Sequence, residues 1–156
     1  MQVFHRLLYR VAGYLMSAEM AIMRVVAPPV YNGDELTNEQ VKSLVKQFDY
    51  KYFQPLDTSY KAVTLDSVKS FLENDRLSEH PYIKQYFDCD DFQVILAGRL
   101  KLWGQGIPSG LLFVKGHALN LIVAEQNNEY KLFKIEPQND TITEVTGDDE
   151  IVFVIL

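Results

Sequence analysis

The sequence contains one cysteine, and its surroundings decide whether it could react. Cys89 lies in the run YFDCDDF, among carboxylates and aromatic rings. An apolar pattern of helical spacing follows it, and the free backbone N–H groups at the start of a helix favour a thiolate over a thiol. The neighbouring carboxylates oppose that effect, because negative charges beside a thiolate disfavour it. A reactive Cys89 therefore needs a base as its partner.

His117 is the best candidate for that base. It begins an expected strand in the run KGHALNLIV, whereas His5 falls in the N-terminal segment and His80 in a polar loop before a proline. The next expected strand runs back across the turn QNN and ends at Glu136, which places this carboxylate near the height of His117. A carboxylate in that position can hold one tautomer of the imidazole. Cys89, His117 and Glu136 thus form a candidate nucleophile, base and orienting acid.

Four further residues could support such a site. Gln85, one turn before Cys89, is our candidate for a side-chain donor in an oxyanion hole. Trp103 and the loop GQGIPSG after it could form a wall of the cleft, although a tryptophan at the end of an amphipathic helix is more often part of the core. Asp90 and Asp91 are most simply acids that stabilise the N-terminus of the helix, and as an alternative they are candidate calcium ligands.

The elements that must position these residues read as helices followed by strands. Capping-box spacing in TNEQ and further cap residues predict three helices, at about 37–48, 64–74 and 90–103, with a short helical stretch at 82–87. Short β-branched and aromatic runs separated by turn residues then predict strands at 111–114, 118–124, 130–136, 141–145 and 151–155. The sequence therefore predicts an α+β fold, in which N-terminal helices and a helix led by the cysteine precede an antiparallel β-meander.

The N-terminal segment is apolar, but charges interrupt it. Its longest charge-free run, residues 11–18, is too short to cross a bilayer, so we expect no transmembrane span. Apolar residues at helical spacing predict a stripe that packs against the domain, a second copy of the chain or a membrane surface. The stripe consists of Leu7, Leu8, Val11, Leu15, Ala18, Ile22, Val25 and Val26.

Composition bounds the class of protein. With 156 residues, of which 47% are apolar, the chain can bury one proper core, and we expect a helical extension over 1–59 and a main domain over 60–156 in one compact unit. A net charge of −6 argues against a nucleic-acid partner, which would require basic patches. A single cysteine excludes an intramolecular disulfide. A soluble protein is expected, with the cytoplasm as the default compartment.

The motifs DCDDF, GHALN and IEPQ, in this order, resemble a known family. They resemble the papain-like cysteine protease domain at the C-terminus of the fairy-ring mushroom agglutinin, and small bacterial and phage proteins that share that domain. The resemblance covers about residues 60–156. It implies a papain-like fold and a calcium-dependent peptidase that acts on a protein or peptide, with Cys89 as nucleophile, His117 as general base and Glu136 as the orienting residue.

These observations together predict a thiol hydrolase that cleaves a peptide or related amide bond through an acyl-enzyme. Its chemistry requires no cofactor, and calcium is a candidate ligand. A transglutaminase-type acyl transferase would use the same three residues. A non-catalytic papain-like interaction module is the third alternative, and it could self-associate through the helix expected over 1–27.

Overall fold

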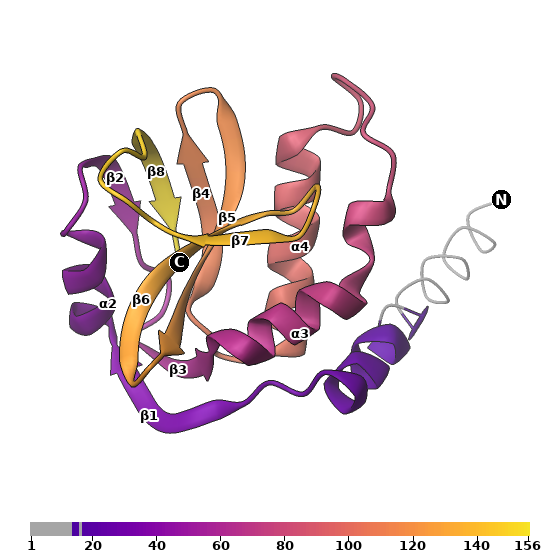
Figure 1. Ribbon diagram of the computed structural model, residues 1–156, viewed down its shortest axis with the longest axis horizontal. Helices are drawn as coiled ribbons and strands as arrows, with labels where there is room; N and C mark the ends of the chain where they lie inside the picture. Colours follow the sequence, from indigo (N-terminus) through magenta and orange to yellow (C-terminus); the bar gives the residue numbers. More distant parts are fainter. Residues whose placement is uncertain (1–13, 16) are drawn as a thin grey trace, which may run out of the picture.

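The computed structural model describes residues 14, 15 and 17–156, and the strands of this part form one mixed sheet (Figure 1). The strands are β1 (Tyr31–Thr37), β2 (Tyr50–Gln54), β3 (Ser59–Thr64), β4 (Ser109–Val114), β5 (His117–Gln126), β6 (Glu129–Glu136), β7 (Thr141–Glu144) and β8 (Ile151–Ile155). The helices are α2 (Asn38–Val45), α3 (Leu65–Asp75), α4 (Cys89–Trp103) and the short 3-10 helix η1 (Leu77–Glu79). Residues 17–26 are also helical and are called the N-terminal helix below.

β5 is the centre of the sheet, because it pairs with three other strands. The main path runs β1-β3-β5-β4-β8-β2, and β6 pairs with both β5 and β7. The pairs β3–β5 and β2–β8 are parallel, whereas the remaining pairs are antiparallel. The predicted fold class, a papain-like arrangement of helices followed by an antiparallel meander, is therefore wrong: the sheet is mixed, and it takes three strands from the N-terminal half of the chain.

The sequence analysis missed those three strands because they carry few apolar residues. β1 and β2 end the main path of the sheet, and Leu36 is the one buried side chain described in either strand. β1 also contains Gly33 at a φ of +92° and an irregular register around it. β3 shows the clearest signal, since Tyr60 and Ala62 alternate on its buried face.

Local capping explains where the helices begin. The hydroxyl of Thr37 accepts from the Gln40 N–H while the Gln40 side chain accepts from the Thr37 N–H, which is the predicted capping box at the start of α2. Thr64 caps α3 through its bond from the Ser67 N–H. These two helix starts confirm the predictions made from capping spacing.

The helices cover both faces of the sheet (Figure 1). α3 and α4 pack on one face around Phe71, Phe92 and Trp103, and α2 packs on the other through Val41 and Val45. Two buried amides fix α4 on β4 and β5. Gln93 Nε2 donates to the Leu112 carbonyl at 3.0 Å and also to the Leu119 carbonyl, and Asn120 Nδ2 donates to the Gln93 carbonyl at 2.9 Å. This register sets the height of α4 along the sheet.

The N-terminal helix packs on the body, but not through the predicted stripe. Met20, Met23 and Ala27 are buried against the α3–α4 layer, and Trp103 Nε1 donates to the Ala27 carbonyl at 2.5 Å. The described members of the stripe, Leu15, Ala18, Ile22, Val25 and Val26, are exposed, and Leu7, Leu8 and Val11 lie outside the described residues. The prediction that this stripe is buried against the domain is wrong, because methionines on the opposite face make the contact.

Among the described residues, the structure shows no helix that is long and apolar enough to cross a membrane. The proposed division of the chain at residue 59 stays a prediction. Residues 31–54 supply β1, α2 and β2, so this part of the expected extension contributes strands to the sheet as well as a helix.

Candidate functional site

The clearest polar pair of the candidate site joins β5 to β6. His117 Nε2 lies 2.5 Å from Glu136 Oε2, and Glu136 Oε1 accepts from the Gln138 N–H at 3.3 Å. An ionised carboxylate can only accept, so Nε2 carries a proton in this pair. The two side chains are 34% and 23% exposed, which leaves the ring fixed by its neighbour yet accessible from outside.

Cys89 lies at the same end of the fold as this pair. α4 begins at Cys89 and β5 begins at His117, and both starts lie in the upper part of the molecule in Figure 1. The Gln93 side chain on α4 is hydrogen-bonded to the Leu119 carbonyl on β5, which puts these two residues at the same height. Cys89 precedes Gln93 by about one helical turn, roughly 6 Å along α4. His117 precedes Leu119 by two strand residues, about 6.6 Å along β5. The thiol and the imidazole therefore lie at a similar height along the sheet.

The thiol and the imidazole do not touch. Cys89 is half-buried and unoxidised, and within the part of the chain that the structure describes its sulfur has no hydrogen-bond partner. The structure thus joins His117 to Glu136 directly and brings Cys89 to the same edge without a bond to either.

Carboxylates surround the thiol. Donor atoms of Asp88, Cys89 and Asp90 lie within 4.8 Å of one another, which is close enough for one cation to contact all three. A hydrogen bond between the two carboxyls raises the pKa of Asp90 and lowers that of Asp88. Asp91 does not belong to this cluster. Its Oδ2 accepts a hydrogen bond from the Asp88 N–H at 3.1 Å and so caps the N-terminus of α4.

This geometry changes which acids are candidates for calcium. The sequence analysis named Asp90 and Asp91, whereas the structure puts Asp88 beside Asp90 and gives Asp91 to the helix cap. The alternation DCD was the available signal for the missed Asp88. Calcium prefers six or more oxygen ligands, so these side chains alone would have to share the ion with water or a ligand.

The two remaining predicted site residues lie in different places. Gln85 is exposed in the loop before Cys89, at a φ of +66°, and its N–H donates to Asp88 Oδ2 at 3.1 Å. Trp103 is buried at the far end of the 15-residue α4, about 21 Å along the helix from Cys89, so it packs in the core and does not line this site.

Comparison with known proteins gives similarity at the level of structure. The sequence matches no protein-family model and no curated protein. Solved structures of similar fold include one described as the PSL1a-E64 complex, with 25% identity and a TM-score of 0.66 over 78% of this chain and 51% of that chain. They also include Polyporus squamosus lectin bound to the human-type influenza-binding epitope Neu5Aca2-6Galb1-4GlcNAc, with 24% identity and a TM-score of 0.64 over 78% and 49%. This chain therefore spans about half the length of each.

These comparisons overturn the family prediction. One of the two structures is named as a lectin, and neither is named as a peptidase. The assignment to the papain-like cysteine proteases is therefore wrong, and so is the function predicted from it, a thiol hydrolase with a catalytic triad. The likeness to these two structures is a likeness of fold.

Proposed function

We propose that this chain is a non-catalytic ligand-binding module, whose site lies where α4 and β5 begin. The observation that carries the proposal is the His117–Glu136 pair, an imidazole held in one tautomer and left partly exposed. The thiol of Cys89 and the carboxylates of Asp88 and Asp90 cluster at the same end of the fold. A few convergent polar groups at one accessible edge are typical of ligand sites.

One structure of similar fold is described as a complex with E-64, and for this chain we propose that the reagent reacts at Cys89. E-64 is an epoxide, and a thiolate opens it in one balanced step. The Cys89 sulfur forms a bond to an epoxide carbon, the bond from that carbon to oxygen breaks, and the oxygen takes up the proton that the thiol gives up. The whole reagent then stays attached, so binding involves no release of product.

Intact-mass measurement after incubation with E-64 tests this proposal. We expect one adduct with the mass of the whole reagent in the wild type, none in Cys89→Ser, and slower labelling in His117→Ala and Glu136→Gln. Glu129→Gln, at the other end of β6 from Glu136, is the matched control and should label at the wild-type rate. Failure of Cys89 to label, or equal labelling in all these variants, would contradict the assignment of the site.

A turnover assay tests the non-catalytic part separately. We expect no cleavage of casein or of fluorogenic peptide amides, with or without calcium. Cleavage that disappears in Cys89→Ser would refute a binding-only function and would show that the site is catalytic.

Carbohydrate binding is a second candidate, favoured by the lectin of similar fold. Carboxylates such as Asp88 and Asp90 can accept hydrogen bonds from sugar hydroxyls. Calorimetric titration with the trisaccharide of that lectin is the test. Heat of binding that disappears in Asp88→Asn/Asp90→Asn would support this candidate, and absence of heat in the wild type would exclude this sugar.

Self-association through the N-terminal helix also stays a proposal. Leu15, Ile22 and Val25 are 65%, 64% and 81% exposed, so the helix presents an apolar face to solvent. Sedimentation velocity of Leu15→Asp is the test, with Leu56→Asp, at a site that is 66% exposed, as the control. A concentration-dependent dimer lost only in Leu15→Asp would support the proposal, and a monomeric wild type would contradict it.

A further inference from the structure

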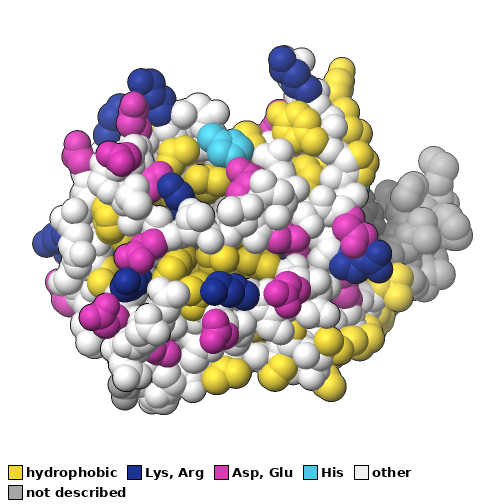
Figure 2. All heavy atoms as spheres, in the orientation of Figure 1, with side chains coloured by type: hydrophobic (Ala, Val, Ile, Leu, Met, Phe, Trp, Pro, Cys, Tyr) yellow, Lys and Arg dark blue, Asp and Glu magenta, His cyan; other side chains and the backbone are white. Residues whose placement is uncertain are grey.

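The loop that leads into Cys89 exposes three large apolar side chains. Tyr82 is 51% exposed, Ile83 49% and Tyr86 84%. Figure 2 shows hydrophobic side chains gathered on this loop where it projects from the molecule at the upper right. We call these three residues the apolar arm. Large apolar groups concentrated on a projecting loop commonly mark a contact site.

The loop is built to hold these side chains outward. Its backbone closes on itself through bonds from the Ile83 N–H to the Phe87 carbonyl, at 2.9 Å, and from the Phe87 N–H to the Ile83 carbonyl, at 2.7 Å. The Phe87 ring anchors the base of the loop, with centroids 4.2 Å from His80 and 4.8 Å from Phe92. The arm is therefore exposed on an anchored scaffold, and the short helix predicted for 82–87 is wrong, because the stretch forms a tight turn closed by this bridge.

The arm stands beside the candidate site. Desolvation raises the pKa of the Tyr82 phenol, and so do the neighbouring charges, with Asp88 first. The Gln85 N–H also donates to Asp88, so the turn of the loop is tied to the first residues of the site. A ligand held at Cys89 that extends toward the loop would meet the two tyrosine rings.

We propose that Tyr82, Ile83 and Tyr86 select ligands that carry an apolar group next to the polar group held at Cys89 and His117. The inference rests on the proposed function, since it names the chemistry of a ligand for the same site. Tyrosine suits this task because its ring offers a large contact area and loses little conformational freedom on binding. The ligand class is thus an amphiphilic small molecule, polar at one end and apolar at the other.

Alkylation of the single cysteine by two reagents tests the inference. Iodoacetamide carries no apolar group, and N-benzyl-2-iodoacetamide carries one. In both, the Cys89 sulfur forms a bond to carbon as iodide leaves. We expect the benzyl reagent to react about tenfold faster with the wild type, as one well-placed aromatic contact would provide. The ratio should fall to about 1–3 in Tyr82→Ala and Tyr86→Ala, on the same basis, while Tyr82→Phe keeps it.

The control is Tyr14→Ala, which removes a tyrosine that is 76% exposed on another part of the chain and should leave the ratio unchanged. A ratio near one in the wild type, or a ratio that ignores both arm tyrosines, overturns the inference alone. A cysteine that reacts with neither reagent, or at a rate indifferent to His117→Ala, overturns the proposed function and this inference with it.

Discussion

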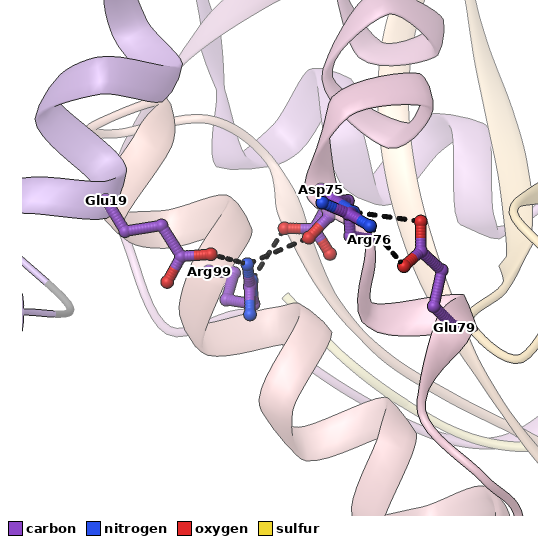
Figure 3. Close-up of polar contacts among 5 residues, drawn as sticks. All are labelled: Glu19, Asp75, Arg76, Glu79 and Arg99. Carbon is purple, nitrogen blue, oxygen red and sulfur yellow. Dashed lines mark hydrogen bonds and ion pairs between the residues drawn. The ribbon is translucent and has the colours of Figure 1, made fainter.

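Arg99 on α4 joins three helices, and its removal should be costly (Figure 3). Its Nε lies 2.6 Å from Asp75 Oδ1, and its Nη2 donates to the Asp75 carbonyl at 2.9 Å and to the carboxylate of Glu19 on the N-terminal helix. The Asp75 side chain is 0% exposed and Arg99 is 17% exposed. Arg99 is thus the cation that compensates a fully buried carboxylate.

Arg99→Met keeps most of the side-chain volume and removes that cation. Among the described residues, Arg99 is the side chain that hydrogen-bonds the Asp75 carboxylate, so the variant would leave this buried carboxylate without its cation. Breaking a buried pair in this way costs about 3–5 kcal/mol, and we expect the lower end, about 3 kcal/mol, because the partial exposure of Arg99 lets water approach. The double variant Asp75→Asn/Arg99→Met removes both charges and should cost only about 1 kcal/mol.

Urea denaturation followed by circular dichroism gives the free energy of unfolding of each variant. Glu19→Gln is the control, because it removes only the more exposed partner of Arg99, and it should cost less than about 1 kcal/mol. A cost below about 1 kcal/mol for Arg99→Met, or a double variant at least as unstable as the single one, would refute the reasoning, because either result would mean that Asp75 does not depend on Arg99.

Three further predictions follow from particular residues. Gly110→Ala should destabilise the protein by at least about 3 kcal/mol in urea denaturation, because its Cβ would lie 1.9 Å from a backbone carbonyl oxygen of β8. Gly98→Ala, on a helix, meets nothing within 4 Å and should stabilise the protein by about 0.5–1 kcal/mol. Equal effects of the two substitutions would contradict this packing. Burial raises the pKa of Asp75, so the folded state binds the Asp75 proton more tightly than the unfolded state does. The stability that this proton contributes is therefore lost as pH rises from about 3.8 through the folded-state pKa. Asp75→Asn should flatten the plot of unfolding free energy against pH in this range, and an unchanged slope would contradict the prediction. Calcium, if it binds beside the thiol, should give calorimetric heat that Asp88→Asn/Asp90→Asn abolishes, and heat retained in that variant would place the ion elsewhere.

Helices and strands were predicted well where the sequence contains helix-capping residues or runs of β-branched residues. α4 begins at Cys89, one residue before the predicted start, and β8 spans the predicted residues. The register across the turn after Gln126 brought His117 to Glu136 as expected from pairing. These features depend on local chemistry, which a single sequence contains.

The remaining features depend on tertiary contacts. β1 and β2 owe their strand structure to neighbours in the sheet and carry little apolar periodicity of their own. The side of the N-terminal helix that packs is set by how Met20 and Met23 fit the α3–α4 layer, whereas the larger apolar stripe stays in solvent. Family motifs of four to five residues were too short to decide function.

The rate at which iodoacetamide alkylates Cys89 at pH 7 tests the central claim, that Cys89, His117 and Glu136 form one site. The account predicts that His117→Ala lowers the second-order rate constant by about tenfold or more, that Glu136→Gln lowers it less, and that Glu129→Gln, at the other end of β6, leaves it unchanged. The same rate constant in all four proteins would contradict the account, because it would show that the thiol is independent of the pair on β5 and β6.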